Sequence, residues 1–161
     1  MDGDWDARVE AVWADETLSD EERIVRIDAL AAERGEDDAR GLFERAGARD
    51  SAGWETEAEP LYRRALAAGL DEEHRAQAVI QLASTLRNLG RAGESVEMLR
   101  AERERGGPLA DSAAAFYALA LVSDGDPRAA VAVALETLAP HLPRYTRSVA
   151  AYARELADPP R

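Results

Sequence analysis

Few side chains of this sequence have the types and spacing that catalysis or metal binding needs. The chain holds two His, His74 and His141, and neither Cys nor Lys, so every other basic side chain is Arg. A nucleophile needs a base beside it, and a zinc site needs several His, Cys or carboxylate ligands at short spacing. Neither His has a second His at ligand spacing. We therefore expect no metal, no cofactor and no enzymatic activity.

Two acidic runs, at residues 36–38 and 71–73, are the next candidates for chemistry. A calcium-binding loop needs alternating oxygen ligands around a Gly, and neither run has this pattern. The dipole of a helix stabilises Asp and Glu in its first turn, which is a sufficient explanation for both runs. The acid pair Glu57 and Glu59 is of a kind common on exposed helices and does not indicate glycosidase chemistry. An enzyme or small-ligand binder is thus the third interpretation of this chain.

The composition is typical of a soluble globular protein. The chain has 161 residues, 46% of them hydrophobic, and a mean hydropathy of −0.40. No apolar run reaches about 18 residues, the length that spans a bilayer. The start, MDGDWDARVE, lacks the basic and hydrophobic parts of a signal peptide. We therefore expect a cytoplasmic protein, and without Cys it can form no disulfide framework.

The acidic charge lies entirely in the first part of the chain. The net charge is −12, and residues 1–60 hold 19 Asp and Glu against 7 Arg, whereas residues 61–161 hold 13 of each sign. Binding to nucleic acid or to an anionic membrane needs clustered cations, so we expect neither partner. The use of Arg without Lys, together with abundant Ala, is typical of a GC-rich bacterial gene.

The stretch at residues 76–102 predicts two helices joined at Gly90. At 3.6 residues per turn its first half separates into an apolar face and a polar face. The apolar face consists of Val79, Leu82, Ala83, Leu86 and Leu89, and the polar face of Gln77, Gln81, Ser84, Arg87 and Asn88. Helical spacing resumes after Gly90 with Val96, Met98 and Leu99. The stretch is therefore expected to be a helical hairpin with one packed side and one free side.

A period along the chain is the strongest signal in the sequence. Gly53, Gly90 and Gly125 each separate two helical segments, at spacings of 37 and 35 residues. Five residues after each Gly comes a small side chain, at Ala58, Ser95 and Ala130. Four residues later comes a position that we expect to fill the space between hairpins, at Tyr62, Leu99 and Ala134. The pattern predicts three stacked hairpins, at residues 39–70, 74–107 and 109–142.

The three hairpins resemble the tetratricopeptide repeat family, whose units are helix-turn-helix hairpins of about 34 residues. The resemblance extends over about residues 39–142, and signature positions are held by Leu42, Ala46, Gly53, Ala58, Tyr62 and Ala65, by Val79, Leu82, Ala83, Leu86, Gly90, Ser95 and Leu99, and by Ala114, Tyr117, Ala118, Leu121, Gly125 and Ala130. Arg45 and Arg49 depart from it, because they stand where the first unit should be apolar. The resemblance implies an all-α, right-handed array of stacked antiparallel hairpins.

A pair of acidic helices at residues 1–36 is expected to cap the N-terminal end of the array. The first helix, from about Asp4 to Ala14, has Trp5, Val9, Val12 and Trp13 on one face. This face is interpreted as buried, with a hydrophobic anchor for a partner as the alternative. In the second helix Ser19 and Glu22 form a capping box.

A helix at residues 143–158 is expected to cap the other end of the array. Pro143 is placed to begin it, and an apolar stripe is predicted from Tyr145, Val149, Tyr152 and Leu156. The last unit of a repeat array needs such a lid, because its outer face has no further neighbour to cover it.

The family's geometry implies that the first helix of each hairpin lines a concave surface that can bind a peptide. That surface would be lined by Arg40, Phe43, Glu44, Gln77, Ile80, Gln81, Ser84, Arg87, Asn88, Ser112, Phe116 and Leu119. Members of the family that bind chaperone tails hold basic and amide side chains where this chain has Phe43, Gly47, Gln81, Ser112 and Phe116, so this specialisation is not expected. The protein is interpreted as a scaffold or adaptor that binds a protein or peptide, with a homodimer subunit as the alternative.

Overall fold

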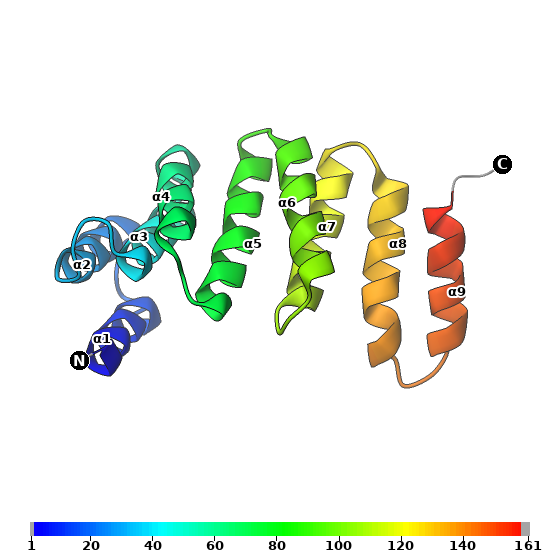
Figure 1. Cartoon of the computed structure of the whole chain (residues 1–161), viewed down its shortest axis with the longest axis horizontal. Coiled ribbons are helices and arrows are strands. Elements are labelled where there is room, and N and C mark those ends of the chain that lie inside the picture. Colours follow the sequence, from blue (N-terminus) through cyan, green and yellow to red (C-terminus); the bar gives the residue numbers. More distant parts are fainter. Residues whose placement is uncertain (1, 159–161) are drawn as a thin grey trace. The chain divides into compact units, whose positions relative to one another are not determined.

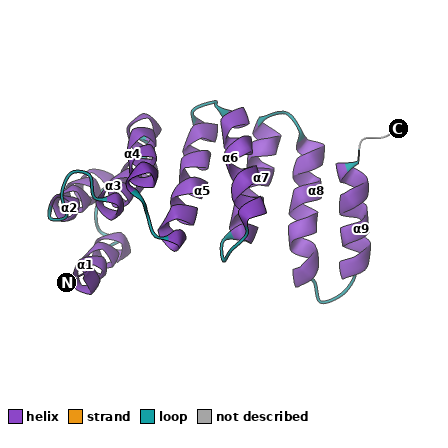
Figure 2. Ribbon diagram, in the orientation of Figure 1, coloured by secondary structure: helices purple, strands orange, loops and turns teal. Residues whose placement is uncertain are grey.

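The structure is a computed structural model that describes residues 2–158, the side chain of Asp2 excepted. Its described residues form helices and loops without any strand (Figures 1 and 2). The α-helices are α1 (Asp2–Ala14), α2 (Asp20–Ala32), α3 (Ala39–Ser51), α4 (Glu55–Ala68), α5 (Glu72–Asn88), α6 (Ala92–Arg105), α7 (Ala110–Ser123), α8 (Pro127–Leu138) and α9 (Thr146–Ala157), with a 3₁₀ turn at Ala139–His141. The predicted all-α fold is confirmed.

The chain divides into two compact units. The N-terminal unit, Met1–Thr85, contains α1 to α4 and most of α5, and the C-terminal unit, Leu86–Arg161, contains the last turn of α5 and the helices α6 to α9. In the first unit α3 packs against α2 and α4, and in the second unit α6, α7, α8 and α9 pack in chain order. No helix among residues 2–158 is both long and apolar enough to cross a bilayer.

The three turns that the glycine period predicts have one geometry. Gly53, Gly90 and Gly125 have φ of 75°, 79° and 94°, in the left-handed region that favours Gly. The amide after each Gly donates to the carbonyl five residues back, as from Trp54 to Arg49 at 2.8 Å and from Arg91 to Leu86 at 2.9 Å. This is the Schellman motif, which ends a helix and satisfies its last carbonyls.

The small residues after these turns are buried where the helices meet. Ala58 and Ser95 have no exposed surface, and Ala130 is 3% exposed. Tyr62 and Leu99, one turn later, are buried as well. Ala134, at the corresponding place in the third hairpin, is exposed and does not fill the space between hairpins. A methyl group is too short for that role, and a surface hollow lies beside it.

The N-terminal helices pack around the two Trp side chains of the first helix. Trp5 is 4% exposed, lies in a core cluster with Val9 and Ile27, and donates its indole N–H to the carbonyl of Leu30 at 2.8 Å. The predicted capping box at the start of α2 is confirmed, since the Ser19 side chain accepts from the backbone of Glu22 and the Glu22 side chain accepts from the backbone of Ser19.

Arg45 and Arg49, which break the apolar pattern of the first hairpin, are paired with one acid of α2. Asp28 accepts hydrogen bonds from Arg45 Nε at 3.1 Å and from Arg49 Nη2 at 2.8 Å. Burial opposes ionisation of Asp28, but the hydrogen bonds and charges of the two Arg outweigh it and lower its pKa. These side chains therefore join α2 to α3 by charge, at two positions of α3 where the sequence resemblance predicts apolar side chains.

The predicted apolar stripe of the last helix is wrong in two of its four positions. Tyr145 and Tyr152 are 75% and 61% exposed, whereas Ala153 is 2% exposed. The helix begins at Thr146 rather than at Pro143, and Tyr145 precedes it with a φ of 68°, outside the helical phase. Ala153 is the buried residue of α9, and Val149 and Leu156, the other two positions of the predicted stripe, are half-buried.

Candidate functional site

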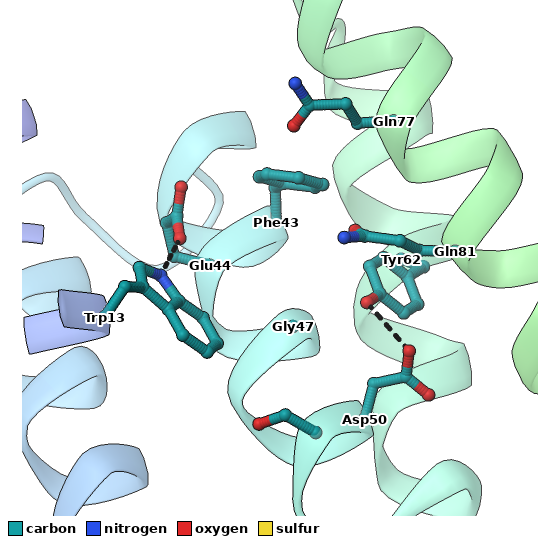
Figure 3. A pocket seen from close by; sticks show the side chains of 9 residues that line it. Trp13, Phe43, Glu44, Gly47, Asp50, Tyr62, Gln77 and Gln81 are labelled. Atoms are coloured by element: carbon teal, nitrogen blue, oxygen red, sulfur yellow. Dashed lines mark hydrogen bonds between the residues drawn. The ribbon is translucent and has the colours of Figure 1, made fainter. Parts of the chain in front are cut away.

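A hollow of about 400 Å³ opens on the N-terminal unit between α1, α3, α4 and α5 (Figure 3). We call it the N-terminal pocket, and it is lined by Trp13, Phe43, Glu44, Gly47, Asp50, Ser51, Tyr62, Gln77 and Gln81. Phe43, Gly47 and Asp50 follow one another at i, i+4 and i+7 in α3, and Gln77 and Gln81 are four residues apart in α5. Each set therefore lies on one face of its own helix, and that face is turned toward the pocket.

Trp13 forms the wall of the pocket that comes from α1. Its indole N–H donates to Glu44 Oε2 at 2.8 Å, and Glu44 is itself 7% exposed (Figure 3). The indole lies close to Gly47 of α3, since a Cβ at Gly47 would be 3.5 Å from Trp13 Cζ2, an ordinary van der Waals contact. The first helix thus contributes a fixed aromatic surface, held by a hydrogen bond to a buried carboxylate.

Phe43 and Tyr62 form the opposite aromatic surface. Their ring centroids are 6.3 Å apart with the rings tilted by 55°, within the range of a favourable aromatic pair. Tyr62 has no exposed surface, and burial together with the charge of Asp50 raises the pKa of its hydroxyl. Tyr62 is therefore neutral at physiological pH and donates its O–H to Asp50 Oδ2 at 3.4 Å (Figure 3).

Asp50 is a pocket carboxylate without a cationic partner among the described residues. Its hydrogen-bond donors are two hydroxyl groups, Thr85 Oγ1 at 2.9 Å from Oδ1 and the Tyr62 hydroxyl at 3.4 Å from Oδ2. Burial raises the pKa of Asp50, and the charge of Glu55 raises it further. The hydrogen bonds from Thr85 and Tyr62 lower it, but burial outweighs them. A carboxylate can accept about four hydrogen bonds, so Asp50 retains acceptor capacity toward the pocket.

Gln81 adds an unused acceptor to the same pocket. Its side-chain oxygen Oε1 is buried and has no hydrogen-bond partner. A buried polar atom left unpaired costs free energy, about 1–3 kcal/mol, that a ligand donor would recover. The pocket therefore combines two aromatic surfaces with acceptors that are not fully used.

A second hollow of about 410 Å³ adjoins the N-terminal pocket and shares Trp13, Phe43, Glu44 and Gln77 with it. Its further lining consists of Asp6, Val9, Glu10, Arg40, Glu73 and His74. Four of its ten lining residues are acidic and one is Arg, so this surface is acidic.

Arg40 is engaged by acids of its own chain in this second hollow. Its Nη2 lies 3.3 Å from Asp6 Oδ1 of α1 and 3.2 Å from Glu44 Oε1 of α3. Its Nη1 lies 3.3 Å from His74 Nδ1, which in turn lies 2.6 Å from Asp71 Oδ2. Arg40 therefore neutralises part of this acidic surface and is not an unpaired cation for a ligand.

The structure brings some of the sequence-predicted site residues together. Phe43, Glu44, Gln77 and Gln81 line the N-terminal pocket, and Arg40 lines the hollow beside it. Ile80 is 6% exposed and packs in the core, while Ser84 is half-buried in α5.

The other predicted site residues belong to the C-terminal unit. Arg87 donates to the Asn88 side chain at 3.3 Å in the last turn of α5. In α7, Ser112 and Leu119 are exposed and Phe116 is half-buried. The part of the groove assigned to these five residues stays a prediction.

Four pocket residues were not predicted to line the binding surface: Trp13, Asp50, Ser51 and Tyr62. The spacing of Phe43, Gly47 and Asp50 on one helix face could have revealed Asp50. Trp13 could not be found in this way, because it reaches the pocket through the packing of α1 and not through the repeat pattern.

The C-terminal unit has a hollow of a different kind, about 580 Å³, between α7 and α8. Apolar side chains dominate its lining, among them Leu119, Val122, Val131 and Leu138, each about half exposed. Its polar edge is the pair of His141 Nε2 and Asp111 Oδ2, 3.0 Å apart. Among the described residues, no group of His, Cys, Asp or Glu has the arrangement of a metal site.

Antiparallel helices packed in chain order, joined by periodic Schellman turns, define a helical-repeat protein. The sequence model of the tetratrico peptide repeat family matches residues 39–156, and the chain belongs to this family. The predicted family is thereby confirmed. No curated protein and no solved structure matches the chain.

Proposed function

We propose that the protein is a non-enzymatic adaptor that binds a protein or peptide segment through the faces of α3 and α5 that line the N-terminal pocket. The observation that supports this proposal is the N-terminal pocket, whose lining combines aromatic side chains with polar atoms that are not fully hydrogen-bonded. Membership of a repeat family whose hairpins generally serve as interaction scaffolds supports the same conclusion. Phe43, Gln77 and Gln81 are the proposed contact residues in this pocket.

The test is selection of binders from a random peptide library, followed by measurement of their affinity for two variants. Gln77→Ala with Gln81→Ala removes both amides from the pocket, and we expect about a tenfold loss of affinity or more with unchanged helicity. Thr56→Ala, exposed on α4 and outside the pocket lining, is the control and should bind as the wild type does. Peptides that bind both variants equally well would overturn the proposal.

The alternative, a structural homodimer subunit, stays a prediction. It is separated from the adaptor by mass in solution, measured by light scattering during size-exclusion chromatography. The adaptor is expected at the mass of one chain, 17.5 kDa. Twice that mass over a range of concentrations would favour the homodimer.

A further inference from the structure

We propose that the N-terminal pocket receives a cationic side chain of the bound segment, an arginine, whose guanidinium lies between Trp13 and the Phe43–Tyr62 pair and donates to Asp50 and Gln81. The inference rests on the proposed function, because it names the chemistry of the ligand for the same pocket. Nothing in the repeat pattern implies it, since the pocket depends on α1 and on an acid in the last turns of α3.

The charge balance of the pocket favours a cation. Asp50 has hydroxyl partners and no cationic partner among the described residues, while Glu44 is paired with Arg40. An incoming anion would meet two carboxylates, Glu44 and Asp50, at short range. A guanidinium would instead neutralise Asp50 in a partly buried place, where charge pairs are stronger than at an exposed surface.

The hydrogen-bonding pattern favours a ligand with several donors. Asp50 has acceptor capacity beyond its two hydroxyl partners, and Gln81 Oε1 is buried without a donor. Arg is the side chain with five N–H donors in a planar fork and no acceptor. One guanidinium can donate to two acceptors at once in a fixed planar geometry. A Lys ammonium can also donate to two acceptors, but its geometry is less fixed.

The walls of the pocket suit the flat face of a guanidinium. The indole of Trp13 is fixed by its hydrogen bond to Glu44, and Phe43 packs against the buried Tyr62 (Figure 3). Cations bind over the faces of Trp, Tyr and Phe, and Arg does so more often than Lys. The same unit already contains such pairs, with Arg34 over Trp5 at 4.7 Å and Arg23 over Trp13 at 5.9 Å.

The acidic hollow beside the pocket extends the complementary surface. Asp6, Glu10 and Glu73 line it together with the already paired Arg40. A segment whose arginine enters the N-terminal pocket would place its neighbouring residues along these acids. The favoured partner is therefore a basic segment of a protein, with more than one positive charge.

The experiment uses the full chain and a short fluorescein-labelled peptide of Gly, Ser and Leu that carries several arginines, with binding followed by fluorescence anisotropy. Matched peptides hold citrulline, lysine or glutamate in the arginine places; citrulline keeps the shape of arginine without its charge. We expect the arginine peptide to bind about tenfold or more tightly than the citrulline peptide, with lysine between them and glutamate weakest.

Two variants locate the effect. Asp50→Asn keeps the size of the side chain and should remove most of the preference for arginine over citrulline. Asp37→Asn removes the same charge from an exposed loop position, where Asp37 pairs with Arg64 at 2.7 Å, and should leave the preference unchanged. Circular dichroism of both variants shows whether the helices remain intact.

The outcomes separate this inference from the proposed function. Selected peptides that are neutral or acidic and lose affinity on the Gln77 and Gln81 double change would support the adaptor and overturn the arginine pocket. An arginine preference that persists in Asp50→Asn, or that Asp37→Asn reduces equally, would overturn the pocket as its origin. If no peptide binds at all, both proposals fail.

Discussion

At the scale of single residues, Asp28 of α2 pairs with Arg45 and Arg49, the two charged side chains that interrupt the apolar pattern of the first hairpin. Asp28→Asn is expected to lower the free energy of unfolding by about 1–2 kcal/mol at neutral pH, because Arg45 and Arg49 both lose a charged acceptor. Urea unfolding measures the effect. Asp4→Asn, an exposed acid that pairs with Arg8 at 3.4 Å, is the control and should cost less than about 0.5 kcal/mol.

The effect of Asp28 depends on pH in a defined direction. The pKa of Asp28 is lower in the folded state than in the unfolded chain. Its stabilisation is therefore complete above the unfolded pKa of about 3.9 and is lost as pH falls through the lower, folded pKa. The difference between wild type and Asp28→Asn should shrink over that acidic range, and a difference that grows there would contradict the pairing.

Asp50 is expected to show the opposite sign. Burial raises its folded pKa, with Thr85, Tyr62 and Glu55 as the groups around it, and Tyr62 stays neutral throughout. The wild type therefore loses stability as pH rises from the unfolded pKa through the raised one, whereas Asp50→Asn does not titrate at this position. Urea midpoints should favour Asp50→Asn more at about pH 7 than at about pH 3. A variant that is relatively weaker at the higher pH would show that ionised Asp50 is stabilised without a ligand.

At the scale of elements, the last helix buries Ala153 rather than Tyr152, the residue that the predicted apolar stripe contains. Tyr152→Ser is expected to change the free energy of unfolding by no more than about 0.5 kcal/mol, because Tyr152 is exposed on α9. Ala153→Leu should cost about 1–3 kcal/mol, because its larger side chain forces α9 away from α8. Chemical denaturation measures the free energy of unfolding of the two variants. A larger loss for Tyr152→Ser than for Ala153→Leu would contradict the observed packing and favour the stripe that the sequence predicts.

The glycine period allowed the hairpins to be predicted because it depends on local chemistry. A left-handed residue after a helix requires Gly, and Gly53, Gly90 and Gly125 satisfy that need without tertiary contacts. In the last helix the predicted stripe includes Tyr145 because it assumes a start at Pro143, and the observed start at Thr146 leaves Tyr145 outside the helix. Tyr152 lies within the helix but at the edge of its buried face, and tertiary packing buries the neighbouring Ala153 instead.

The candidate site was partly predictable for the same reason. Gln77 and Gln81 follow from the polar face of α5, and Phe43 follows from the geometry that the family resemblance implies. Trp13 does not, because its place in the pocket depends on how α1 packs and on the hydrogen bond from its indole N–H to Glu44. A helix outside the repeat thus changes the chemistry of the surface that the repeats provide.

At the scale of the whole molecule, the acidic charge of the chain is related to the lining of the N-terminal pocket and of the hollow beside it. The net charge is −12, and it lies within residues 1–60, the part of the chain that supplies α1 and α3. Acids of these two helices line the N-terminal pocket and the hollow beside it. The charge therefore supports a basic partner segment, in line with the sequence expectation that nucleic acid is not the ligand.

The most direct test of the adaptor account is a titration of the ¹⁵N-labelled protein with the tightest peptide from the library, followed by NMR. The account predicts that amide signals of Gly47 and Asp50, the side-chain amides of Gln77 and Gln81, and the indole N–H of Trp13 shift together and saturate at one peptide concentration range. Shifts confined to residues of α6 to α9, or no saturable shift at the N-terminal pocket, would contradict it.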